Sequence, residues 1–124
     1  MPKRVLVAED HDDLRSIVEL SLSSEGYEVT TARDGLEALE IARRDAPDIL
    51  VTNLDMPRLD GLGLIKRLRG ELHLHNLPVI ILSGAGHHST EAVVEAGAYT
   101  FLCKPVDLAQ LGEYVKLSLE AGSR

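Results

Sequence analysis

Tryptophan is absent from this 124-residue chain, and aromatic residues make up only 3% of it. Hydrophobic residues still reach 44% and charged residues 27%, which is typical of a globular domain whose core is built from Val, Leu, Ile and Ala. Cys103 is the only cysteine, so an internal disulfide is excluded and no second thiol is present for a zinc site. We expect Cys103 to be a buried apolar filler, and the length predicts one domain over residues 1–124.

Long apolar runs are also missing. The first run, Val5 to Ala8, stops at Glu9-Asp10, which is too short for a signal peptide and far too short for a membrane span. Basic residues are outnumbered, and the net charge of −7 disfavours direct binding to nucleic acid, whose phosphates would be repelled. These absences predict a cytoplasmic protein that binds neither membrane nor nucleic acid directly.

Short apolar or β-branched runs are what the chain does contain, and five of them are spaced along it. Continuous runs of this length, without polar alternation, are typical of strands buried on both faces of a parallel sheet. They cover residues 5–8, 27–31, 49–52, 79–82 and 100–103, the second being the weakest.

Helical patterns separate these runs. Apolar residues recur with helical spacing at Leu14, Ile17, Val18 and Leu22, then at Leu36, Leu39 and Ala42, at Ile65 and Leu68, and at Leu108, Leu111 and Val115. A weaker helix is expected over residues 90–96. Strand and helix thus alternate five times, which predicts an α/β fold: a (βα)5 doubly wound parallel five-stranded sheet with right-handed crossovers.

Polar residues follow four of the predicted strands. Glu9 and Asp10 end the first, Asn53 and then Asp55 the third, Ser83 the fourth, and Lys104 the fifth. Ligands of open α/β sheets bind at the carboxyl ends of the strands, so these side chains should meet at one edge. Clustered oxygen ligands suit Mg²⁺, while a lysine and a hydroxyl could hold a phosphoryl group.

These motifs resemble those of bacterial response-regulator receivers, in order and spacing, over nearly the whole chain. The matching segments are Glu9-Asp10, Asn53–Gly61, Ser83-Gly84, Gly97-Ala98 and Phe101–Pro105. The resemblance implies a flavodoxin-like fold with strand order 2-1-3-4-5. It also implies a phosphorylation-controlled switch of a two-component system.

The resemblance also implies roles for single residues at the metal site. Asp10 would bind Mg²⁺ directly, Glu9 would act on it through water, and the backbone carbonyl of Asp55 would be a main-chain ligand. The side chain at position 53 would be both a metal ligand and the phosphoacceptor.

Four further positions would serve the phosphoryl group and the switch. Ser83 would turn toward the phosphoryl group on activation, Lys104 would pair with its oxygens, and Phe101 would swing inward. Pro105 would follow Lys104 through a peptide bond that is commonly cis in the family. A histidine kinase or phosphotransfer protein would supply the phosphoryl group, and the face made by the fourth helix, fifth strand and fifth helix would contact an output domain or protein.

Asn53 is the departure from this pattern, since the family carries an aspartate three residues before the Met56-Pro57 pair. A carboxamide cannot form an acyl phosphate, and it is a weaker Mg²⁺ ligand than a carboxylate. Either an engineered Asp-to-Asn substitution or a natural loss of phosphorylation explains it. The other site positions are intact, which favours the engineered substitution.

A different class of protein is the alternative. A haloacid-dehalogenase-like, Mg²⁺-dependent phosphatase would use Asp10 as its nucleophile in the pattern Asp10-His-Asp12, but the receiver motifs would then be unexplained. The histidines show no metal-site spacing with a Glu partner and are expected in exposed loops. They are His11, His73, His75, His87 and His88.

Overall fold

The computed structural model describes residues 2–84 and 100–122, and its centre is a parallel sheet of five strands in the order β2-β1-β3-β4-β5. The strands are β1 (Arg4–Ala8), β2 (Glu28–Ala32), β3 (Ile49–Asn53), β4 (Val79–Ser83) and β5 (Thr100–Cys103). Each strand lies within two residues of its predicted range, and the predicted strand order is confirmed.

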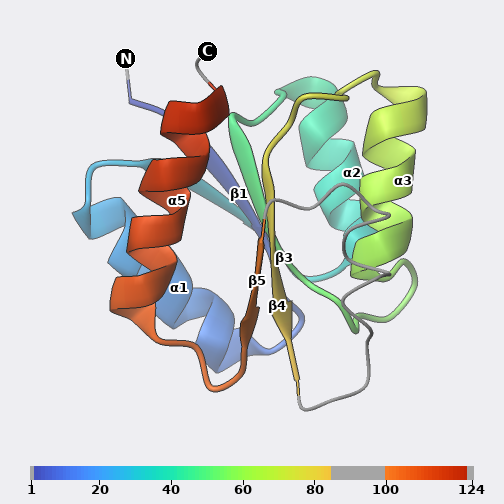
Figure 1. Ribbon diagram of the computed structural model, residues 1–124. Helices are drawn as coiled ribbons and strands as arrows, with labels where there is room; N and C mark the ends of the chain where they lie inside the picture. The colour runs from blue at the N-terminus through green and yellow to red at the C-terminus, as the bar shows by residue number, and fades with distance from the viewer. Residues whose placement is uncertain (1, 85–99, 123–124) are drawn as a thin grey trace.

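Helices cover both faces of the sheet, as the predicted doubly wound fold requires. They are α1 (Asp12–Ser24), α2 (Gly35–Arg44), α3 (Gly61–Glu71) and α5 (Leu108–Gly122). Figure 1 shows α1 and α5 on one face of the sheet and α2 and α3 on the other. The helix expected over residues 90–96 lies outside the described residues, as do His87 and His88.

The helix faces predicted from apolar spacing pack against the sheet, with two exceptions to the expected burial. Val18 and Leu22 of α1 are fully buried, and aliphatic side chains fill the space between helices and strands on each face. Ile17 is 49% exposed and Leu36 is 38% exposed, because each lies at the margin of its helix's apolar stripe. The expectation that Cys103 is buried was wrong, since it is exposed at the end of β5.

Helix starts follow from local side chains. The Asp34 carboxylate accepts a hydrogen bond from the Glu37 amide at 2.9 Å and caps α2. Asp60 caps α3 in the same way, through the Gly63 amide at 2.8 Å. These caps also hold the loops that precede α2 and α3, which lie beside the ends of β2 and β3.

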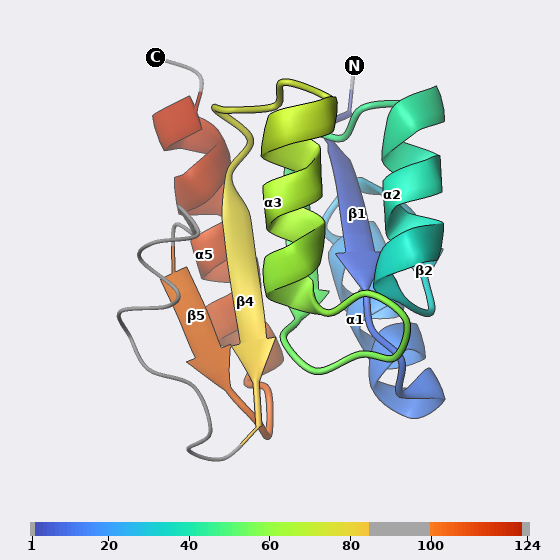
Figure 2. The ribbon, with the colours of Figure 1, turned by 90° about the vertical axis from the view of Figure 1, so that its right-hand side faces the viewer.

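All five strands run parallel, so their carboxyl ends lie at one edge of the sheet. Figure 2 shows the β3–α3 loop, residues 54–60, at the same edge as the arrowheads of β1 and β4. Both chain ends lie at the opposite edge (Figure 1). The predicted site residues therefore share one edge of the sheet.

Candidate functional site

Asn53, the last residue of β3, is the hub of this edge. It is only 5% exposed, and its Nδ2 lies 3.1 Å from Glu9 Oε2, 2.9 Å from Asp10 Oδ1 and 2.9 Å from the Asp55 carbonyl oxygen. Its Oδ1 accepts a hydrogen bond from the Asp55 amide at 3.3 Å. One carboxamide therefore joins the end of β1, the end of β3 and the start of the β3–α3 loop.

The orientation of the Asn53 side chain follows from the chemistry of these partners. Ionised carboxylates and a backbone carbonyl can only accept hydrogen bonds, so the amide nitrogen must face them. An amide nitrogen carries two hydrogens, so three acceptors must share them. The arrangement stabilises two neighbouring carboxylates with a neutral donor.

Glu9 lies fully buried beneath this hub, with 0% of its surface exposed. Its Oε2 also accepts a hydrogen bond from the His11 amide at 3.0 Å, while its Oε1 lies 3.1 Å from Lys104 Nζ. The ammonium approaches Oε1 off the hydrogen-bonding direction, so charge attraction alone holds this ion pair. A buried carboxylate is costly without an opposite charge, and Lys104 supplies that charge to Glu9.

Ser83 and Lys104 meet at the ends of β4 and β5. The Lys104 amide donates to the Ser83 carbonyl at 2.7 Å, and the Ser83 hydroxyl donates to the Gly84 carbonyl at 3.0 Å. The Lys104-Pro105 peptide bond is cis. Phe101 is 38% exposed, and its role as a switch residue stays a prediction.

An open, acidic hollow of about 390 Å³ lies over the hub, lined by Asp10, Asp55, Met56, Pro57 and Asp60. Beside it, an apolar groove of about 490 Å³ runs between α1 and the β5–α5 connection; it is lined by His11, Leu14, Ile17, Lys104, Pro105, Val106 and Leu108. No local sequence pattern predicts this groove, because its walls come from two segments that are distant in the chain. Lys104 belongs to both the buried ion pair and the groove.

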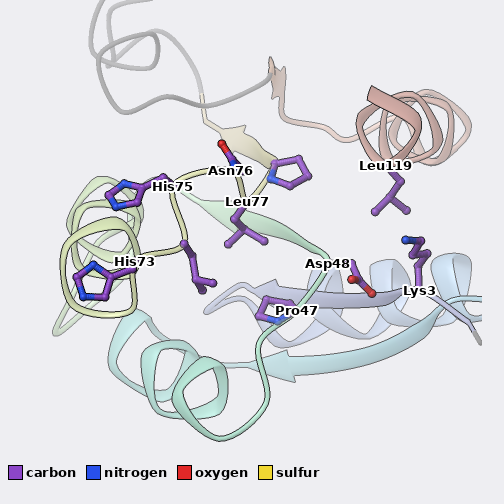
Figure 3. Close-up of a pocket in the computed structure, with 10 residues that line it drawn as sticks. Lys3, Pro47, Asp48, His73, His75, Asn76, Leu77 and Leu119 are labelled. Carbon is purple, nitrogen blue, oxygen red and sulfur yellow. The ribbon is translucent and has the colours of Figure 1, made fainter. Parts of the chain in front are cut away.

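A cleft of about 370 Å³ at the opposite edge of the sheet is a poor candidate for the site. Figure 3 shows Lys3 and Asp48 near one end of it and His73 and His75 at the other. The two imidazole rings lie 6.1 Å apart between centroids, and both histidines are exposed, as expected. No reactive pair converges there, whereas acids, an amide and a lysine converge around Asn53.

The oxygen atoms around Asn53 are of the type that a hard cation prefers, but they are not arranged to bind one while the amide lies between them. Glu9, Asp10 and the Asp55 carbonyl supply the oxygens that Mg²⁺ prefers. Mg²⁺ binds oxygen at about 2.1 Å, so the oxygens would have to close in and the amide would have to move away. Within residues 2–84 and 100–122, no three His, Cys, Asp or Glu side chains form a metal-ligand group.

Arg58 is a further residue that the sequence analysis missed. Its Nε and Nη2 donate to Asp34 Oδ2 at 3.0 and 2.7 Å, which ties the β3–α3 loop to the start of α2. Burial by itself raises the pKa of Asp34, but hydrogen bonds from the Glu37 amide and the Arg58 guanidinium outweigh burial and hold that pKa below its usual value. No local sequence pattern pairs two residues that are 24 positions apart.

Comparison with known proteins identifies the same family as the sequence motifs do. Residues 5–116 match the model of the response regulator receiver domain. Response regulator MprA of Mycobacterium tuberculosis is 41% identical over 112 residues, which cover 90% of this chain and 48% of that protein. Response regulator PleD of Caulobacter vibrioides is 36% identical over 108 residues, which cover 86% of this chain and 24% of that protein. The chain therefore spans at most about half the length of these relatives.

Solved structures are similar in fold as well. The receiver domain of the Francisella response regulator 1452 is 34% identical with a TM-score of 0.84, and the match covers 96% of this chain and 98% of that one. Chemotaxis protein CheY4 of Vibrio cholerae is 27% identical with a TM-score of 0.88, covering 95% of this chain and 99% of that one.

Proposed function

Because this chain belongs to the response regulator receiver domain family, we propose that it is a two-component receiver whose position 53 cannot accept a phosphoryl group. The observation that carries the proposal is the carboxamide of Asn53, which occupies the buried end of β3 between Glu9 and Asp10. A carboxamide nitrogen is a poor nucleophile, and no acyl phosphate can form on it.

The surrounding residues support the part of this proposal that makes the chain a two-component receiver. With an aspartate at position 53, Asp10, Glu9 and the Asp55 carbonyl would hold Mg²⁺, which would neutralise charge on the incoming phosphoryl group. Lys104 lies beside Glu9 and would pair with the phosphoryl oxygens, leaving Glu9 to the cation. Ser83 would turn its hydroxyl away from the Gly84 carbonyl to join them.

Asn53 also supports a consequence of this proposal, namely that Mg²⁺ binds weakly. Its amide already satisfies the oxygens that a cation would need, and its removal from them costs hydrogen bonds. The chain should therefore rest in the inactive state whether or not Mg²⁺ is present.

The partners in this proposal follow from the family. Receivers of response regulators interact with histidine kinases and output domains. A histidine kinase or phosphotransfer protein would approach position 53 over the acidic hollow, with the apolar groove beside Lys104 as the adjoining surface. The output partner would contact the face made by the fourth helix, β5 and α5; the fourth helix lies outside the described residues. Phe101 lies on this face and would be the residue that reports the switch.

Two origins of Asn53 fit this proposal, and the intact surroundings favour one. A site that had lost its selective value would change at several positions, yet Glu9, Asp10, Ser83 and Lys104 all keep receiver-like chemistry. An engineered Asp-to-Asn substitution in an active receiver is therefore favoured over natural loss. The residue encoded at position 53 of the natural gene decides between them.

The alternative of a haloacid-dehalogenase-like phosphatase finds no support in the comparisons, and receivers are signalling domains rather than enzymes. Asp10, its required nucleophile, is held by the Asn53 amide. Within the described residues, no helix is both long and apolar enough to cross a membrane. A cytoplasmic location stays a prediction.

The test is phosphorylation from a small donor. The chain is incubated with acetyl phosphate and Mg²⁺, and intact mass is measured beside that of Asn53→Asp. We expect a phosphoryl adduct on Asn53→Asp only, and Asn53→Asp with Lys104→Ala should label poorly. Stable labelling of the unaltered chain at residue 53 would contradict the proposal, as would an Asn53→Asp variant that folds but never labels.

A further inference from the structure

The β3–α3 loop contains a strained backbone turn at Arg58. Its φ is 69°, a left-handed value that residues with a side chain rarely adopt, and the Leu59 amide donates to the Pro57 carbonyl at 2.8 Å. A hydrogen bond across three residues with a positive central φ marks a γ-turn of the rare, strained kind. Such strain persists only where surrounding contacts hold it in place.

The contacts that hold this turn come from α2. Two guanidinium donors of Arg58 reach one oxygen of Asp34, whose side chain is 13% exposed. The other oxygen of Asp34 accepts from the Glu37 amide and caps the helix. A Cβ added to Gly35 would collide with the Leu59 carbonyl oxygen, so the loop also lies directly against the first residue of α2.

The other end of the same loop meets the hub. The Asp55 carbonyl accepts from Asn53 Nδ2 at 2.9 Å, and the Asp55 amide donates to Asn53 Oδ1. Only Met56 and Pro57 separate Asp55 from Arg58, and the proline ring fixes its own φ. Because this connection is short and partly rigid, a displacement of Arg58 should also displace the Asp55 carbonyl.

We infer that Arg58 is a positioning residue: its ion pair with Asp34 holds the strained turn and thereby fixes the Asp55 carbonyl beneath the side chain of residue 53. The Asp34 carboxylate thereby links the start of α2 to the site. This inference deepens the proposed function, since the Asp55 carbonyl is there a ligand of the cation. The Asp55 carbonyl already holds this position in the chain with Asn53, so the role of Arg58 can be tested there without a cation.

The Asn53 side-chain amide offers a direct readout of this geometry. In a ¹⁵N-labelled sample, its two protons should be shifted and should exchange slowly with water, because both are hydrogen-bonded and buried. We expect Arg58→Ala to move these signals and to speed their exchange by about fivefold or more, as a loosened loop opens more often. A merely structural loss of stability would instead speed exchange in every helix and strand together.

Controls separate the ion pair from general effects. Arg67→Ala removes an Arg–Glu pair on the exposed surface of α3, where Arg67 Nε lies 2.5 Å from Glu71 Oε1, and it should leave the Asn53 signals unchanged. Asp34→Asn should act like Arg58→Ala, and the double variant should be no worse than either alone. Arg58→Gly should exchange more slowly than Arg58→Ala, because glycine adopts a positive φ without strain.

Three results would overturn the inference. They are unchanged Asn53 signals in Arg58→Ala, an equal response to Arg67→Ala, or additive effects of the Asp34 and Arg58 substitutions. Isothermal titration of Mg²⁺ into Asn53→Asp adds a second arm, in which Arg58→Ala should weaken binding by about tenfold. If Asn53→Asp neither binds Mg²⁺ nor labels, the proposed function fails, while the amide signals of the Asn53 chain still decide the role of Arg58.

Discussion

Replacing Asn53 by aspartate should convert a stable, metal-indifferent site into an unstable, metal-dependent one. The substitution is nearly isosteric, but it puts a carboxylate oxygen where Nδ2 now donates to Glu9, Asp10 and the Asp55 carbonyl. Three attractive contacts of 2.9–3.1 Å become contacts between acceptors. Two of them bring carboxylates together.

The expected loss of stability can be bounded from both sides. Two hydrogen bonds to charged groups, at about 1.5 kcal/mol each, give a loss of about 3 kcal/mol. Coulomb repulsion would add to this, but the cluster can escape it by taking up a proton. Protonating an aspartate of pKa about 4 at pH 7 costs about 4 kcal/mol, and its single O–H replaces only one of the two N–H donors, so the loss is at most about 5–6 kcal/mol. We therefore expect Asn53→Asp to be less stable by about 3–6 kcal/mol in metal-free buffer at pH 7, with a Tm lower by about 10 °C or more.

Mg²⁺ should restore this stability in the variant only. Each tenfold excess of free Mg²⁺ over its dissociation constant returns about 1.4 kcal/mol. Urea denaturation followed by circular dichroism, with chelator and with Mg²⁺, measures both effects on the two proteins. Two results would refute the idea that the Asn53 amide takes the place of the cation. One is an equal unfolding free energy of the two proteins in chelator, and the other is an equal gain in unfolding free energy of both proteins on adding Mg²⁺.

Further outcomes follow from other contacts. Lys104→Met should cost about 2 kcal/mol in urea denaturation, since it leaves buried Glu9 unpaired, and a second substitution Glu9→Gln should recover most of the loss. The low pKa of Asp34 means that its charge stabilises the fold fully above the unfolded-state pKa of about 4 and that this stability is lost as pH falls through the lower folded-state value. Asp34→Asn should remove that part of the acid limb in a pH series of Tm; an unchanged acid limb would contradict it. Gly61→Ala should lose about 2 kcal/mol because its Cβ would meet the Asn53 carbonyl oxygen, whereas Gly70→Ala, in open space on the same helix, should gain about 0.5 kcal/mol. Equal Tm values for the two alanine variants would show that the β3–α3 loop tolerates the extra methyl group.

The charge balance of the site explains why these effects are expected to be large. Glu9 is fully buried and Lys104 is the cation beside it, so there is little water to screen their interaction. In surface pairs such as Arg43–Glu71 and Arg33–Glu37 both side chains are about a third or more exposed, so water screens the charges and the pairs should contribute far less. Substitutions in the site should therefore lower the free energy of unfolding by more than substitutions of ion-paired residues on the helix surfaces.

Much of the fold was readable from local patterns. Continuous apolar runs predicted the strands because a parallel sheet covered on both faces buries every side chain of its central strands, as β3 and β4 show. Capping residues such as Asp34 and Asp60 act through bonds three residues along the chain, so spacing alone is enough to predict them. The strand order came from family resemblance, and the structure confirms it.

The convergence of strand ends was equally predictable, since parallel strands must end at one edge. The family resemblance placed the phosphoacceptor at position 53, and chemistry then predicts that a carboxamide there cannot form an acyl phosphate. These conclusions depend on residue type and on order along the chain. Both are written in the sequence itself.

Only the tertiary structure decided which side chains contact one another within the site. The sequence could not show that the Asn53 amide turns its nitrogen to three oxygens, or that Lys104 pairs with Glu9. Nor could it show that Arg58 takes a left-handed turn to reach Asp34, or that Cys103 is exposed. Such features depend on distances between segments far apart in the chain, and those distances are set by how helices and strands pack rather than by any local preference.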